Sequence, residues 1–60
     1  MKFDVIVFKP LASEIYETIT VDVETKAVAE KKVRSIIDAK NRAGIREYND
    51  AKIVRVVTPK

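Results

Sequence analysis

The sequence lacks the residues that cross-link most very small proteins. Its 60 residues include no cysteine and no histidine, which excludes disulfide bonds and the usual zinc and iron–sulfur sites. A chain of this length buries only about 60% of the surface that it exposes when unfolded. Its stability must therefore come from the core or from a partner subunit, and neither a cofactor nor a metal is expected.

Glycine and long apolar runs are also scarce. One glycine, Gly44, is too few for a glycine-rich phosphate-binding loop, and no run approaches the roughly 18 apolar residues of a membrane span. The opening segment MKFDVIVFKP is interrupted by Asp4, and no cleavage site of small residues follows it, so a signal peptide is not predicted. We expect a cytoplasmic protein.

The composition is typical of one folded domain spanning residues 1–60. Hydrophobic residues make up 47% and charged residues 35%, with 12 basic against 9 acidic side chains and a net charge of +3. This mildly basic balance permits a nucleic-acid or acidic-protein partner. A charge excess that only keeps the protein soluble explains it equally well.

Three segments have the pattern of strands. Residues 2–9 (KFDVIVFK) are rich in β-branched and aromatic residues, and their almost continuous apolarity indicates a central strand ending before Pro10. Residues 14–23 alternate apolar and polar side chains, which is typical of a half-buried strand. Residues 51–58 (AKIVRVVT) form the last predicted strand, which Pro59 stops.

Residues 25–43 have the pattern of a helix. Thr25 is the expected N-cap, and Gly44 stands where a left-handed C-terminal residue is needed. The apolar stripe at helical spacing consists of Ala29, Val33, Ile36 and Ile37. The order of elements is therefore β-β-α-β. A hairpin followed by a right-handed crossover predicts an α+β fold, with a three-stranded antiparallel sheet in the order 2-1-3 and the helix on one face.

One helix covers only one face of such a sheet. The side toward the helix is expected to hold Phe3, Val5, Val7, the odd-numbered apolar residues of 14–23, Val54 and Val56. The bare side is expected to hold Ile6, Phe8, Tyr16, Thr18, Thr20, Ile53, Arg55 and Val57. A slip of one residue in the first or last strand would exchange these faces.

The bare side is the predicted partner-binding surface, because an uncovered apolar patch commonly marks an interaction site. Its candidate contact residues are Ile6, Phe8, Tyr16, Ile53, Arg55 and Val57. Two alternatives stay open. Arg55 and Tyr16 are able to shield Phe8 from water without any partner, and a second copy of the chain is another possible occupant.

Nothing in the sequence predicts catalysis. Without histidine or cysteine, the commonest general base and nucleophile are missing. Glu14 and Glu17 point to opposite sides of their strand, and Asp22 and Glu24 lie at the start of the helix, where carboxylates suit the helix dipole. We therefore expect a protein that is not an enzyme.

The basic residues of the helix have two interpretations, a solvated face and a face that contacts phosphates. Lys31, Arg34, Lys40 and Arg42 are the candidates for contact with nucleic-acid phosphates. Helix-spaced ion pairs from Arg34 to Glu30 and to Asp38 are expected to dilute this charge.

Two resemblances suggest partners. The β-β-α-β order, the opening KF strand, the VDVET junction followed by Ala29, and the closing VRVVTPK resemble the T7-type family of small phage inhibitors of bacterial RNA polymerase. This resemblance implies a protein that binds the jaw and cleft of the polymerase, blocks open-complex formation and uses arginine on its last strand, here Arg55.

The second resemblance is to the archaeal ribosomal protein LX family, at KKVRSIIDAKNRAG and the following strand. It implies contact with ribosomal RNA through Lys40 and Arg42. The leading hypothesis is thus a phage-type modulator of transcription that binds host RNA polymerase through the bare sheet face. The alternatives are a ribosomal or RNA-binding module and a homodimeric interaction domain.

Overall fold

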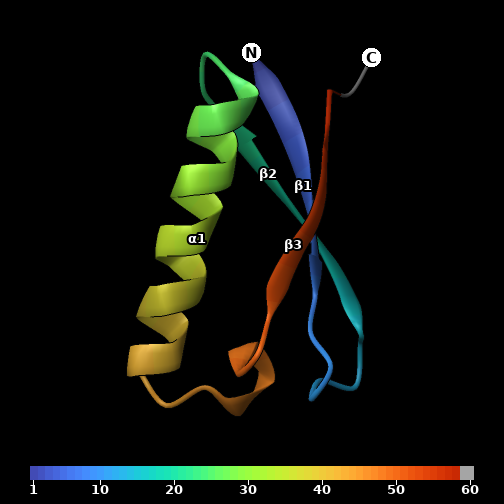
Figure 1. The fold of residues 1–60 in the computed structure, drawn as a ribbon, viewed down its shortest axis with the longest axis vertical. Coiled ribbons are helices and arrows are strands. Elements are labelled where there is room, and N and C mark those ends of the chain that lie inside the picture. Colours follow the sequence, from blue (N-terminus) through green and yellow to red (C-terminus); the bar gives the residue numbers. More distant parts are fainter. Residues whose placement is uncertain (59–60) are drawn as a thin grey trace.

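Three strands and one long helix form the protein in the computed structural model, which describes residues 1–58 (Figure 1). The elements in chain order are β1 (Lys2–Phe8), β2 (Tyr16–Asp22), α1 (Lys26–Arg42), the single 3-10 turn η1 (Arg46–Tyr48) and β3 (Lys52–Val57). Pro59, the predicted stop of the last strand, lies outside the described residues.

The sheet has the predicted topology. Its order is β2-β1-β3, and both outer strands pair antiparallel with β1. Figure 1 shows α1 along one side of the sheet, with no described element on the other side. The near-continuous apolarity of β1 suits its central place, because a central strand has a neighbour on each edge and is covered by α1 on one face.

Local signals fix both ends of α1. The Thr25 hydroxyl accepts a hydrogen bond from the backbone N–H of Val28 (3.2 Å) and caps the first turn. At the other end Gly44 has φ +82°, a left-handed conformation that glycine adopts without strain. The N–H groups of Gly44 and Ile45 then bond back to the carbonyls of Asn41 and Lys40, as in a Schellman motif.

The core lies between α1 and the sheet. Its buried hydrophobic residues are Phe3, Val5, Val7, Val21, Ala29, Val33, Ile37 and Tyr48. The last of these comes from η1, within a segment that the sequence predicted only as a loop. Two residues that were predicted to face the core are not fully buried. Ile36 is half-buried, and Ile15, just before β2, is 47% exposed.

A β-bulge changes the phase of β3. Ile6 pairs with Arg55 whereas Val7 pairs with Ile53, so Val54 is an extra residue without a partner on β1. Before the bulge Ile53 shares the side of Val7 and packs against the core. Val54 itself is 54% exposed.

The bulge overturns two predictions. Ile53 lies toward α1 rather than on the bare side, and Val54 is exposed rather than part of the core. The reason is that the extra residue at Val54 interrupts the alternation of sides along β3. Beyond the bulge the predicted faces of Arg55, Val56 and Val57 are confirmed by their partners on β1.

No helix within residues 1–58 has the length and apolarity to cross a bilayer.

Candidate binding surfaces

The sheet side turned away from α1 forms the first candidate surface, called here the open face. The strand register assigns to it Lys2, Asp4, Ile6, Phe8, Tyr16, Thr18, Thr20, Asp22, Lys52, Arg55 and Val57. Cross-strand neighbours form rows: Tyr16, Phe8 and Lys52 make one row, and Thr18, Ile6 and Arg55 make the next. The open face thus places aromatic, aliphatic and cationic groups within one contact area.

An aromatic pair dominates one end of the open face. The rings of Phe8 and Tyr16 lie with centroids 5.5 Å apart and planes inclined by 49°. Such tilted pairs contribute about 0.5–1.5 kcal/mol beyond burial of area. Tyr16 is nevertheless 62% exposed, so the pair still offers a broad aromatic surface to a partner.

Arg55 lies beside this apolar area on the open face. No carboxylate forms an ion pair with it among residues 1–58, and its side chain is exposed. Asp4, the acidic residue two positions from Ile6 on the same face, instead accepts a hydrogen bond from the Thr20 hydroxyl (2.7 Å). The guanidinium keeps its planar set of donors available, a geometry suited to a carboxylate.

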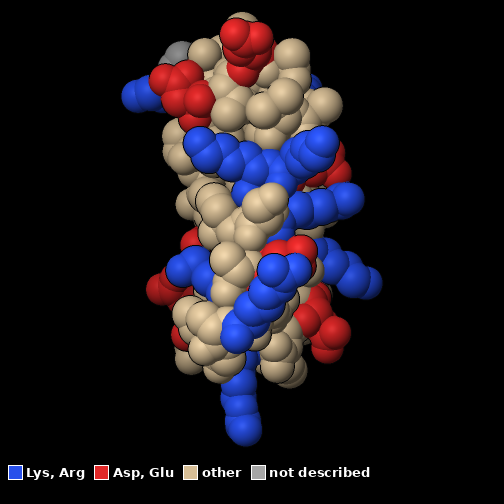
Figure 2. All heavy atoms as spheres, turned by 90° about the vertical axis from the view of Figure 1, so that its left-hand side faces the viewer, with Lys and Arg blue, Asp and Glu red and all other residues tan. Residues whose placement is uncertain are grey.

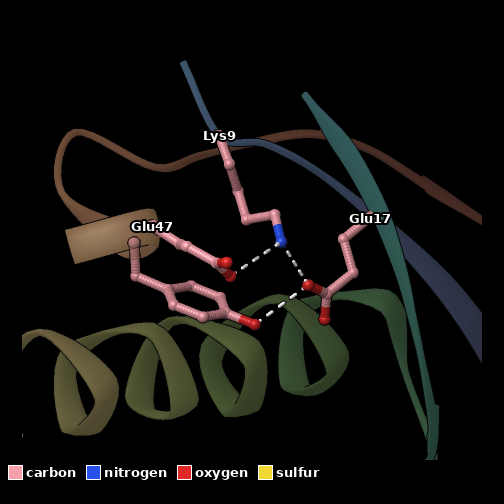
Figure 3. Close-up of polar contacts among 4 residues, drawn as sticks. Lys9, Glu17 and Glu47 are labelled. Carbon is pink, nitrogen blue, oxygen red and sulfur yellow. Dashed lines mark hydrogen bonds and ion pairs between the residues drawn. The ribbon is translucent and has the colours of Figure 1, made fainter. Parts of the chain in front are cut away.

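A buried ionic cluster closes the end of the core nearest the β1–β2 turn (Figure 3). The Lys9 ammonium, on a side chain that is 5% exposed, lies 2.6 Å from Glu17 Oε1 and 3.9 Å from Glu47 Oε2. The Tyr48 hydroxyl donates to the same Glu17 oxygen at 2.9 Å, and the ammonium lies 4.9 Å from the centre of the Tyr48 ring. We call Lys9, Glu17 and Tyr48 the buried triad.

The triad shifts the ionisation of all three groups. The hydrogen bond from Lys9 lowers the pKa of Glu17 below its ordinary value of 4.5, although burial opposes the shift. The same bond raises the pKa of Lys9 above 10.5. Burial, followed by the bond to Glu17, raises the pKa of Tyr48 above 10.0. The charged Lys9–Glu17 pair is thus favoured at neutral pH.

These shifts predict the pH dependence of stability. Glu17 has a depressed folded-state pKa, so its contribution is present above pH 4.5 and is lost as the pH falls through the folded value. Lys9 and Tyr48 have raised pKa values, so their contributions are present below about pH 10 and are lost as the pH rises further. We expect the urea midpoint to form a plateau at intermediate pH and to fall on both sides.

The control for this prediction is the exposed pair at the other end of the sheet. There a hydrogen bond from the N-terminal ammonium lowers the pKa of Asp22. Glu17→Gln should flatten the acid side of the curve far more than Asp22→Asn, because exposed pairs contribute little. Equal curves for the two variants would contradict a role for the triad.

The second candidate surface is the solvent-facing side of α1, called here the outer helix face. It consists of the exposed residues Lys31, Lys32, Arg34, Ser35, Asp38 and Arg42. Figure 2 shows Lys and Arg side chains along the length of this side, with acidic groups mainly toward the upper end and the flanks. Arg34 forms the predicted pair with Glu30 (3.1 Å), whereas the predicted pair with Asp38 is not formed.

Lys40 does not belong to the outer helix face. It is half-buried, and its ammonium lies 5.3 Å from the centre of the Tyr48 ring. It therefore points toward the core side of α1, away from Lys31 and Arg42. Of the four predicted nucleic-acid contacts, the structure brings together Lys31, Arg34 and Arg42.

A hollow of about 530 Å³ separates the second half of α1 from β3. It is lined by Arg34, Ile37, Asp38, Asn41, Asp50, Ala51, Lys52 and Ile53. Asn41 Oδ1 is buried here and receives no hydrogen bond from the described residues. The charged groups of both signs around it favour neither an anionic nor a cationic ligand.

No cluster of three or more acidic side chains suited to a metal ion occurs within residues 1–58. Glu14 and Glu17 do not converge, since Glu17 is committed to the triad.

The sequence contained a signal for the triad that alternation alone would have revealed. Lys9 has the same phase as Phe3, Val5 and Val7, and Glu17 has the same phase as Ile19 and Val21. Opposite charges on the core side of two paired strands, at the same end of the hairpin, predict a buried ion pair. The contribution of Tyr48 had no such signal, because η1 brings it from 31 residues away.

Comparison with protein-family models, with curated proteins and with solved structures found no match to this chain. The resemblances to the phage polymerase inhibitors and to ribosomal protein LX stay predictions.

Proposed function

We propose that this is a small non-enzymatic binding protein that docks on a larger protein through its open face. The observation that carries the proposal is the uncovered sheet side, where Phe8, Tyr16 and Ile6 lie beside an unpaired Arg55. Arginine and aromatic residues are enriched among the side chains that dominate binding energy at protein interfaces. One of the two faces of the sheet is therefore open to contact with such a partner.

The charge of the open face favours a protein over a nucleic acid. Lys52 and Arg55 are offset in part by Asp4 on the same side of the sheet. Its apolar and near-neutral character matches the centre of a protein interface, from which charged residues are depleted. An acidic side chain on the partner would satisfy the Arg55 guanidinium.

Bacterial RNA polymerase is the proposed target, on the basis of the sequence resemblance and of the place of Arg55 on the last strand. In this proposal the protein acts as a transcription inhibitor of phage type, in the host cytoplasm. The open face would occupy a site on the polymerase surface and obstruct promoter opening.

Arg55→Glu is expected to weaken binding to purified bacterial RNA polymerase at least 30-fold, which corresponds to about 2 kcal/mol. The physical reason is that a carboxylate replaces a guanidinium at the centre of the interface. The dissociation constant is measured by biolayer interferometry. The melting temperature should hardly change, because an exposed side chain contributes little to folding.

Arg46→Glu is the matched control, since it makes the same change of charge at an exposed position of η1, off the open face. Its dissociation constant should stay within about threefold of wild type. No binding of the wild type to polymerase at micromolar concentration would refute the target. Equal losses in the two variants would refute the open face as the docking site. Sedimentation of the free protein as a dimer that Arg55→Glu dissociates would assign the face to a second copy instead.

A further inference from the structure

We propose that the outer helix face is a second, independent binding site, which holds the phosphate backbone of a nucleic-acid duplex. This inference does not rest on the open face or on the polymerase as its partner. It rests on where the charge of the protein lies, on the exposure of the cations and on the side chains that the helix lacks.

The whole positive excess of the protein is carried by α1. This helix contains six basic and two acidic residues, a net charge of +4. The remainder of the chain has six basic and seven acidic residues, a net charge of −1. The net charge that a polyanion would attract is thus carried by one element, and Figure 2 shows basic side chains along its outer side.

The cations of the outer helix face are free to exchange partners. The Arg34–Glu30 bridge joins side chains that are 70% and 44% exposed, and such pairs contribute at most about 1 kcal/mol. Lys31 and Arg42 form no ion pair within residues 1–58. A phosphate would therefore displace little when it binds these groups.

The spacing suits a duplex. Lys31 and Arg34 lie one turn apart, and Arg42 follows Lys31 by 11 positions, roughly 16 Å along the helix axis. The major groove of B-form DNA is about 12 Å wide, so long side chains at the two ends reach backbones on both sides of a groove. The contact reads phosphates and not sequence.

The absence of aromatic residues argues against a single strand. Proteins that bind single strands combine cations with aromatic rings on which bases stack. The sequence of α1, KAVAEKKVRSIIDAKNR, contains no aromatic residue, and Phe8 and Tyr16 lie on the opposite side of the molecule. Stacked, paired bases fit this surface better than unstacked ones.

The test is fluorescence anisotropy with labelled 20-base-pair DNA and RNA duplexes at 50–200 mM salt. Three phosphate contacts on DNA give a slope of about −2.7 for log K against log salt, or a loss of about 40-fold in affinity across this range. Each of three single variants should make the slope shallower by about 0.9, to about −1.8: Lys31→Gln, Arg34→Gln and Arg42→Gln. The DNA duplex should bind more tightly than the RNA duplex, because the spacing of the cations was matched to the groove of B-form DNA. Tighter binding of the RNA duplex would contradict that match.

Two variants with the same loss of charge serve as controls. Lys40→Gln removes the cation turned toward Tyr48, and Arg55→Gln removes one from the open face. Both should leave the slope unchanged. The proposal is overturned if the wild type does not bind at 50 mM salt. It is overturned as well if the controls make the slope as shallow as the variants of the outer helix face do. It is also overturned if a single strand or vesicles of anionic lipid bind more tightly than either duplex.

Discussion

Val33→Asp is expected to abolish cooperative folding. Val33 lies at the centre of the buried stripe of α1 and is fully inaccessible to solvent. A carboxylate there enters a cluster of buried hydrophobic side chains, so its burial costs several kcal/mol. The total free energy of unfolding of a 60-residue domain is only about 3–9 kcal/mol. Circular dichroism should show loss of the sheet and helix signals at 25 °C.

Val28→Asp provides the comparison for this variant. It is the same substitution on the same helix, but Val28 is 47% exposed and lies in the first turn, where a negative charge suits the helix dipole. We expect its melting temperature to stay at or slightly above that of wild type. If Val33→Asp also retained a cooperative transition, the described packing of α1 on the sheet would be wrong.

Glu17→Gln is expected to be the most destabilising change of a partly exposed residue. The amide keeps an acceptor for the Tyr48 hydroxyl but leaves the buried Lys9 ammonium without its close counter-charge. Breaking a buried pair in this way costs about 3–5 kcal/mol. The lower end applies here, because the Glu17 side chain is one-third exposed and Glu47 stays 3.9 Å from Lys9. Urea denaturation measures the loss at pH 7.

The second arm of this experiment removes the charge on both sides. Lys9→Met combined with Glu17→Gln leaves no buried ion and still satisfies the Tyr48 hydroxyl, so it should regain most of the lost stability. A double variant that is less stable than Glu17→Gln would show that the Lys9 ammonium stabilises the fold by contacts other than Glu17. The Glu47 carboxylate, 3.9 Å away, and the ring of Tyr48, 4.9 Å away, are the groups that would then be responsible.

The parts of the fold that the sequence predicted are those set by local chemistry. Thr25 and Gly44 mark the ends of α1 because a capping hydroxyl and a left-handed residue act within one turn. The central place of β1 followed from its apolarity and from the handedness of the crossover. Each of these signals needs only neighbouring residues or a general rule of connection.

The errors arose where a distant contact decides the structure. The bulge at Val54 depends on how β3 pairs with β1, and no residue type within β3 predicts it. It moved Ile53 from the open face to the core side and so removed one of six predicted contact residues. The remaining five lie on the open face as predicted. Lys40 was misplaced for a similar reason, since the Tyr48 ring that attracts it belongs to another element.

The central position of β1 also determines the order in which the domain is able to assemble. The hairpin of β1 and β2 joins segments close in sequence, and such hairpins form within about 1–10 μs. The other edge of β1 must wait for β3, which is separated from it by more than 40 residues and carries the larger cost of closing a long loop. Until β3 docks, β1 therefore keeps one unpaired edge on a highly apolar strand. Unpaired strand edges join readily to other chains, so partly folded molecules in which β3 has not yet docked are the ones most open to aggregation.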